Sequence, residues 1–137
     1  MIIAVDFDGT IVEHRYPSIG KERTGAIDTL KQLVKEGNRI ILWTVREGDL
    51  LQEAVDFCRS RGLEFYAVNS NVPQNELFLP SARSVAGKVS ADIYIDDRNI
   101  GGLPDWETIY DLINGIRDER KRVRSRKKGF WKRLFGR

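Results

Sequence analysis

The chain has 137 residues, of which 31% are charged and 41% are hydrophobic, and it contains one histidine and one cysteine. This length provides for one domain with one core, and a lone cysteine excludes a disulfide framework. The net charge of +3 conceals a split, because residues 117–137 hold eleven basic and two acidic residues while residues 1–116 hold twelve and eighteen, so the basic pI does not predict a nucleic-acid-binding body.

The first predicted strand is the apolar run 1–5, which ends in two carboxylates, Asp6 and Asp8, and a Gly9-Thr10 turn. Continuous apolar runs are typical of strands buried on both faces of a parallel sheet, which deliver ligand sites at their carboxyl ends. Side chains two residues apart point to the same side of a strand, so the two carboxylates repel each other unless a cation or a proton neutralises them. The pattern favours a Mg²⁺ site, with a plain turn as the alternative.

Two helices and a second strand follow. Apolar residues recur at helical spacing in about 21–36 and about 48–61, and both segments end near a glycine. Between them, the apolar run 39–44 ends in Thr44, and Arg46 lies two residues further on. A hydroxyl can donate to a phosphate oxygen, and a guanidinium can add a charged fork contact.

The third predicted strand is 63–68, and the segment 71–80 that follows is a loop by its Asn and Pro content. The loop contains three large apolar residues, Leu77, Phe78 and Leu79. They predict either a recognition surface or a segment that docks on the core. Lys88 then precedes the fourth predicted strand, 91–95, which ends in the pair Asp96-Asp97. Adjacent carboxylates repel each other, and they would add oxygen ligands to a metal site.

Asp105 is placed to cap a last helix, and the basic segment 117–137 follows it. Four large apolar residues of this segment fall on one side of a helix: Phe130, Trp131, Leu134 and Phe135. Such an amphipathic basic stretch suits an anionic membrane surface. It also suits the phosphates and bases of a nucleic acid. A further alternative is a helix extension whose aromatic residues cover the domain or a partner subunit.

Taken together, these segments resemble the motifs of the haloacid dehalogenase (HAD) superfamily of phosphohydrolases, over about residues 1–100. Asp6-Phe7-Asp8-Gly9-Thr10 is similar to the first motif, Thr44 to the second, Lys88 to the third and Asp96-Asp97 to the fourth. The alternation of strands and helices predicts an α/β fold with a doubly wound parallel sheet, which is also the HAD-like Rossmannoid fold that the resemblance implies.

The resemblance implies a Mg²⁺-dependent phosphatase that hydrolyses a phosphate monoester. Asp6 would be the nucleophile that forms an aspartyl-phosphate, and Asp8 the general acid and base. Catalysis would also use Thr44 and Lys88, and Lys88 would balance the charge on Asp6. The residues expected to contact substrate are Thr10, Thr44, Arg46 and Lys88. The expected metal ligands are Asp6, Asp8 through its main-chain carbonyl, Asp96 and Asp97, with direct coordination by Asp97 left open.

Many members of the superfamily carry an inserted cap domain, for which the gaps 11–20 and 69–87 leave no room. The expected organisation is therefore a capless catalytic domain, 1–116, followed by the basic segment 117–137. Its site is open unless a neighbouring subunit of a homo-oligomer covers it. The class of phosphorylated substrate stays open, between sugar phosphates, nucleotides and nucleic-acid ends.

Two features predict a cytoplasmic protein. The single cysteine, Cys58, lies on a helix face that is predicted to be in the core, which suits a reducing compartment. The short apolar run at the start contains the predicted nucleophile at its end, which argues against a cleaved signal peptide. The alternative to a phosphatase is a non-catalytic binding or scaffold protein that uses the basic segment to bind an anionic membrane or a nucleic acid.

Overall fold

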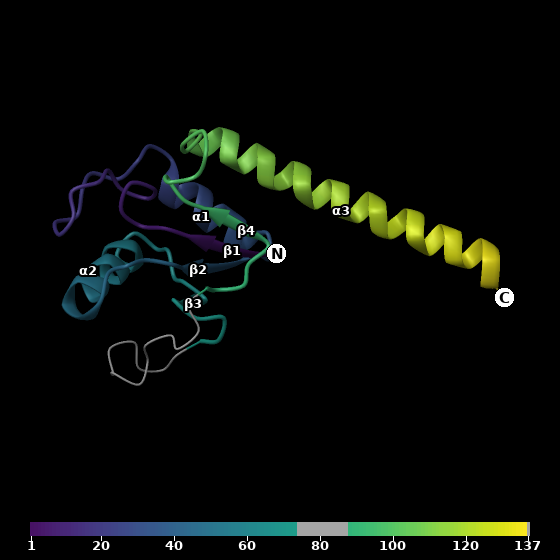
Figure 1. The fold of residues 1–137 in the computed structure, drawn as a ribbon, viewed down its shortest axis with the longest axis horizontal. Helices are drawn as coiled ribbons and strands as arrows, with labels where there is room; N and C mark the ends of the chain where they lie inside the picture. The colour runs from purple at the N-terminus through teal and green to yellow at the C-terminus, as the bar shows by residue number, and fades with distance from the viewer. Residues whose placement is uncertain (74–87, 137) are drawn as a thin grey trace.

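The computed structural model describes residues 1–73 and 88–136. Within them, four parallel strands form one sheet in the order β3-β2-β1-β4 (Figure 1). The strands are β1 (Ile2–Val5), β2 (Arg39–Leu42), β3 (Ala67–Val68) and β4 (Ile93–Ile95). The helices are α1 (Ala26–Lys35), α2 (Gly48–Arg59) and α3 (Trp106–Phe135). The predicted α/β class with a parallel sheet is confirmed.

The main core lies on one face of this sheet. Val5 pairs with Leu42 on β2 and with Ile95 on β4, and Leu42 pairs with Val68, so these four side chains share that face. They pack in one cluster with buried residues of all three helices, including Leu30, Leu51, Ala54, Cys58, Ile109 and Ile113. The burial of Cys58 is as predicted.

The opposite face of the sheet carries a smaller cluster of buried residues, Ile41, Ala67 and Val89. Every helix among the described residues therefore packs on a single face, whereas a doubly wound sheet has helices on both. The connection from β3 to β4 includes residues 74–87, which lie outside the described residues together with most of the predicted loop 71–80. The doubly wound arrangement stays a prediction.

The strands are shorter than the sequence predicts, because main-chain groups near their ends are used elsewhere. In the predicted strand 63–68, the Leu63 N–H donates to the Cys58 carbonyl (3.0 Å) and closes the end of α2. The first hydrogen bond to β2 comes from the Tyr66 N–H to the Ile40 carbonyl (2.8 Å), and β3 is limited to Ala67–Val68. In the predicted strand 39–44, the Thr44 N–H donates to the Asn69 side chain (2.8 Å), and β2 ends at Leu42.

Helix α3 begins as predicted, since the Asp105 carboxylate accepts a hydrogen bond from the Thr108 N–H at 2.8 Å. It then continues through the basic segment to Phe135. Figure 1 shows the first half beside α1 and the second half extending away from the sheet. The four large apolar residues near its end are all more than half exposed, so in this structure they do not cover the domain.

Among the described residues, no helix is both long enough and apolar enough to cross a membrane.

Candidate functional site

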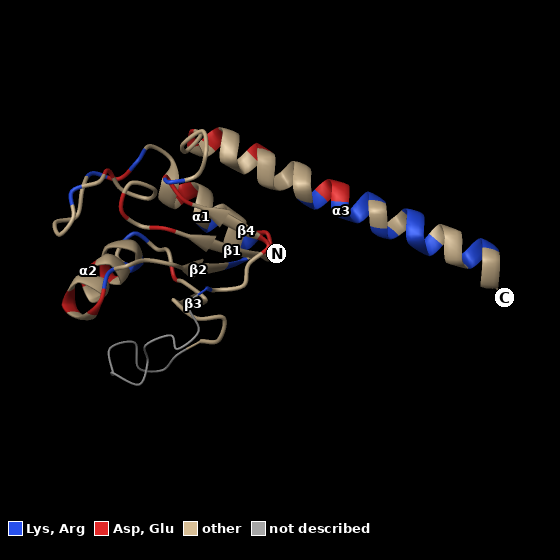
Figure 2. Cartoon of the chain, in the orientation of Figure 1, with Lys and Arg blue, Asp and Glu red and all other residues tan. Residues whose placement is uncertain are grey.

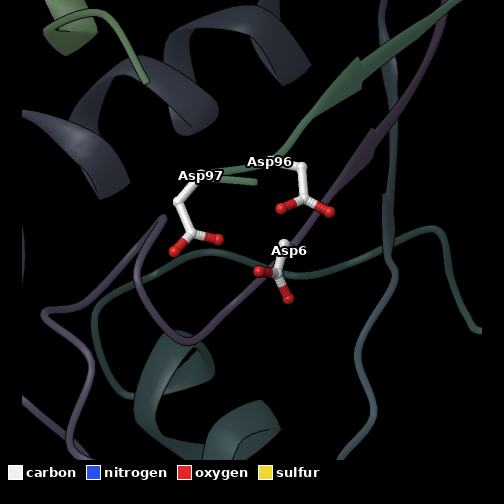
Figure 3. A group of neighbouring side chains, drawn as sticks. All are labelled: Asp6, Asp96 and Asp97. Atoms are coloured by element: carbon white, nitrogen blue, oxygen red, sulfur yellow. The ribbon is translucent and has the colours of Figure 1, made fainter. Parts of the chain in front are cut away.

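Two predicted segments, the ends of β1 and β4, meet at the carboxyl edge of the sheet. Asp6 follows β1 directly, and its N–H donates to the Ile95 carbonyl of β4 (3.0 Å), so the ladder places it beside Asp96. One carboxylate oxygen from each of Asp6, Asp96 and Asp97 lies within 4.8 Å of the others. Figure 3 shows these side chains converging from β1 and β4. The side chains of Asp6, Asp96 and Asp97, which the sequence predicts as metal ligands, therefore lie together, and metal binding by them stays a prediction.

The Gly9-Thr10 turn holds this acidic cluster in place. Thr10 is fully buried, and its hydroxyl donates to an Asp6 oxygen (3.5 Å) and accepts from the Asp97 N–H (3.1 Å). Gly9 has a φ of +82°, and a Cβ added there would lie 2.2 Å from an Asp97 oxygen. Only glycine meets both requirements. Thr10 was expected to contact substrate, but its hydroxyl bonds inside the protein.

The electrostatics of the acidic cluster fit a cation. Burial raises the pKa of Asp6 to about 7, and the charges of Asp96 and Asp97 act in the same direction, while the Phe7 N–H opposes them. One Asp97 oxygen, Oδ1, is buried and has no hydrogen-bond partner among the described residues. Three carboxylates that form no ion pair with any described residue, together with an unpaired oxygen, fit a hard divalent cation such as Mg²⁺. The Asp8 side chain is not part of this group.

Asp8 instead forms a bidentate ion pair with Arg46. The Arg46 Nε donates to Asp8 Oδ2 and Nη2 donates to Asp8 Oδ1, both at 2.7 Å. The remaining guanidinium hydrogens donate to the carbonyls of Pro17 (3.2 Å), Leu50 (3.4 Å) and Ser18 (2.9 Å). The hydrogen bond to Asp8 is the main reason that the pKa of Arg46 is raised.

Arg46 is 0% exposed and uses all five donors of its guanidinium on protein acceptors. The central guanidinium carbon, Cζ, also lies 5.1 Å from the centroid of the Phe7 ring and 5.2 Å from that of the Tyr16 ring. Arg46 was expected to contact substrate. In this arrangement it has no donor left for a substrate, and its contacts orient Asp8.

Asp6, Asp8, Thr44 and Asp96 line one cleft of about 480 Å³, a volume typical of small-ligand sites. The other lining residues are His14, Tyr16, Trp43, Val45 and Arg98. The Thr44 hydroxyl accepts from the Arg46 N–H at 3.2 Å and keeps its own hydrogen for another acceptor. The cleft thus brings together both carboxylates of the first motif, the hydroxyl of the second and one carboxylate of the fourth.

Lys88 is not placed in this cleft. Its side chain is exposed, and its ammonium nitrogen lies 4.9 Å from the centroid of the Tyr94 ring. No ion pair between Lys88 and Asp6 occurs within residues 1–73 and 88–136 of this structure. The expected charge balance between the two side chains stays a prediction.

Two aromatic residues of the cleft were not predicted. Trp43 was taken as part of the apolar strand 39–44, but it follows the end of β2 and packs its ring 5.4 Å from that of Tyr94. Its place next to Thr44 was the signal that could have identified it. Tyr16 lies in the segment 13–18 after the first motif, which the sequence predicts to be one of the loops around the open site, but no pattern in that segment singles out Tyr16 itself.

Comparison with known proteins gives one informative match. No family model and no curated protein match the chain. A solved structure, that of a conserved protein from Bacteroides thetaiotaomicron, has a TM-score of 0.75 and 56% sequence identity to it, over 84% of this chain and 90% of that one. At this identity and coverage, the chain belongs to the same family as that conserved Bacteroides thetaiotaomicron protein.

Proposed function

We propose that this protein is a HAD-type, Mg²⁺-dependent phosphatase that hydrolyses a phosphate monoester through an aspartyl-phosphate on Asp6. The observation that carries the proposal is the acidic cluster at the carboxyl edge of the sheet, beside the cleft that also holds Asp8 and Thr44. Parallel α/β sheets bind ligands at this edge. We also propose that the chain is a member of the HAD superfamily, which its motifs resemble, and that its sheet is doubly wound.

Asp6 would attack the phosphorus of the substrate with a carboxylate oxygen, and the bond from phosphorus to the leaving oxygen would break. Asp8 would donate a proton to that leaving oxygen. In the second step, water would attack the phosphorus of the aspartyl-phosphate and Asp8 would take a proton from that water, while the bond from phosphorus to the Asp6 oxygen breaks, which releases phosphate and restores the Asp6 carboxylate. Asp6, Asp96 and Asp97 would hold Mg²⁺, which screens the approach of one anion to another.

The ion pair with Arg46 bears on how Asp8 would act. Both Asp8 oxygens accept from Arg46, yet each carboxylate oxygen has a second lone pair and Asp8 still lines the cleft. The bidentate contact fixes the orientation of the Asp8 carboxylate at the cleft. Arg46 is therefore best described as a positioning residue, and Thr44 as a donor to the phosphoryl oxygens.

The test is phosphate release from a panel of sugar phosphates, nucleotides and phosphorylated oligonucleotides, with Mg²⁺ and with excess chelator. We expect Mg²⁺-dependent release that Asp6→Asn lowers by at least about a thousandfold, because the amide is not a nucleophile. Asp111→Asn makes the same chemical change on an exposed face of α3 and should leave the rate unchanged. Undiminished turnover in Asp6→Asn would disprove the mechanism.

The covalent step can be tested separately. Borohydride reduces an acyl-phosphate to an alcohol, so treatment during turnover should convert Asp6 to homoserine, which peptide mass spectrometry can locate. Label at another carboxylate would identify that residue as the nucleophile and would exclude Asp6. Phosphate release without any label would favour direct attack by water.

A non-catalytic binding or scaffold protein is the second candidate, favoured by the exposed basic half of α3. The two candidates differ in the activity panel, where a scaffold shows no release from any substrate. They also differ in the effect of Asp6→Asn, which should abolish phosphate release by an enzyme but leave the binding function of a scaffold unchanged.

A further inference from the structure

The second half of α3 makes no contact with the rest of the domain in the part of the chain that the structure describes. The first half docks on the body through buried Trp106 and Ile109 and ion pairs from Arg117 to Glu36 (3.6 Å) and from Arg120 to Asp92 (2.8 Å). From residue 121 to residue 136 every side chain is exposed. At 1.5 Å per residue, about 22 Å of helix extends beyond the body (Figure 1).

This exposed half is strongly and uniformly basic. Residues 121–136 contain eight Lys or Arg and no Asp or Glu, and Figure 2 shows the blue positions concentrated along this part of α3. Several pairs lie four residues apart and repel each other, among them Arg122 with Arg126 and Lys128 with Lys132. A helix without tertiary packing has little to offset such repulsion. An anionic surface would neutralise these charges.

The last turns carry an apolar patch at the end of this basic helix. Its members and their exposed fractions are Phe130 (52%), Trp131 (58%), Leu134 (58%) and Phe135 (68%). The rings of Trp131 and Phe135 stack at 4.9 Å, and Phe130 lies edge-on to Trp131 at 6.3 Å. At 100° per residue the four share one side of the helix, while Lys132 and Arg133 lie on the other.

We infer that the exposed half of α3, residues 121–136, is a docking surface for an anionic lipid bilayer, with the apolar patch inserted at the level of the headgroups. Helices that lie in a membrane interface combine Trp, Phe and Leu on one side with Lys and Arg on the other. Nucleic-acid bases need open aromatic faces, but here Trp131 and Phe135 are stacked on each other and Leu134 cannot stack. Pairing with a second copy would bring two like-charged helices together.

This inference does not depend on the proposed phosphatase activity. It is tested by flotation of the full chain with vesicles of phosphatidylcholine alone and of phosphatidylcholine with about 30% phosphatidylserine. We expect at least about tenfold stronger binding to the anionic vesicles at 0.1 M salt. Raising the salt to 1 M, which shortens the Debye length from about 10 to about 3 Å, should weaken it by a similar factor.

Insertion of the patch is tested with the double variant Trp131→Ser/Phe135→Ser, which should weaken binding to anionic vesicles at least about tenfold. Val34→Ser/Ile100→Ser is the matched control, because it removes two exposed apolar side chains from the body, and it should bind as the wild type does. Lipids brominated along the acyl chains should quench the tryptophan fluorescence of the wild type. They should not quench that of Trp131→Phe, which lacks the tryptophan of the patch.

Three outcomes would overturn the inference. Equal binding to neutral and anionic vesicles would remove the role of charge, and binding that ignores the Trp131→Ser/Phe135→Ser change would remove insertion. Binding of a single-stranded oligonucleotide without binding of vesicles would identify nucleic acid as the partner instead. Hydrolysis of a small phosphate ester should be the same in the patch variants and the wild type, so loss of vesicle binding and loss of the phosphatase are distinguishable.

Discussion

At the scale of single residues, Arg46 contributes both to the stability of the candidate site and to the orientation of Asp8. Its guanidinium is buried and compensates the charge of a carboxylate, Asp8, that is only 8% exposed. Removing one partner of a buried ion pair leaves the other charge without compensation, which typically costs about 3–5 kcal/mol. Its contribution is thus to stability and to the geometry of Asp8 together.

We predict that Arg46→Met lowers the free energy of unfolding by about 3–5 kcal/mol, measured by urea denaturation. Arg61→Met is the matched control. Arg61 also lies over an aromatic ring and near a carboxylate, Glu22 (3.9 Å), but it is half exposed, so its loss should cost about 1 kcal/mol or less.

A double-mutant cycle identifies the source of the effect. If Arg46 acts through Asp8, Arg46→Met should cost clearly less in an Asp8→Asn background, where no buried charge remains. Arg46→Lys, which keeps the charge and loses the fork, should fall between the wild type and Arg46→Met. A cost for Arg46→Met that matches that of Arg61→Met would contradict this account.

The hydrogen bonds of the Arg46 guanidinium also show which part of the site could not be predicted from the sequence. Asp6, Thr44 and Asp96 could be placed together from the sequence alone, because each follows an apolar run and parallel strands share one carboxyl edge. The partners of Arg46 could not, because they include the carbonyls of Pro17 and Ser18, whose position depends on how an irregular segment folds back. Periodicity carries no information about such a segment.

At the scale of elements, the helices were easier to predict than the strands. α2 begins where it was expected and both helices end close to their expected limits, because the spacing of apolar residues follows their buried faces, whereas α1 begins at Ala26, about five residues later than predicted. β3 was predicted as six residues and has two, because part of that run closes the end of α2 through Leu63. A single apolar run does not reveal whether its N–H groups pair with a strand or with a helix end.

Helix α3 divides into a packed half and an exposed half, and we predict that the two differ in hydrogen exchange. Amides in about 106–117 should be protected by the packing of Trp106 and Ile113. Amides in about 121–135 should exchange far faster, because among the described residues only hydrogen bonds within the helix hold that half. Mass spectrometry of peptides from each half measures this difference. Equal protection of both halves would mean that residues 121–135 have a partner within the free protein.

At the scale of the whole molecule, the partly buried acidic cluster lowers the stability of the α/β body when its carboxylates are ionised. The unfolded chain would lose the Asp6 proton near pH 4, while the folded protein holds it up to about pH 7. The folded state therefore binds more protons between these values, and its stability falls as the pH rises through that window. A cation bound at the cluster would compensate for this loss.

We therefore predict that, without divalent metal, Asp6→Asn raises the free energy of unfolding at pH 8 by about 2 kcal/mol, after discounting for the partial exposure of Asp6, and has little effect at pH 4. Mg²⁺ at about 100 times its Kd should stabilise the wild type at pH 8 by about 2.7 kcal/mol, since it binds the folded state alone. Thermal denaturation at matched ionic strength measures both effects. The Mg²⁺ effect should be lost in Asp6→Asn and kept in Asp111→Asn. If Mg²⁺ stabilises Asp6→Asn as much as the wild type, the cation binds somewhere other than this cluster.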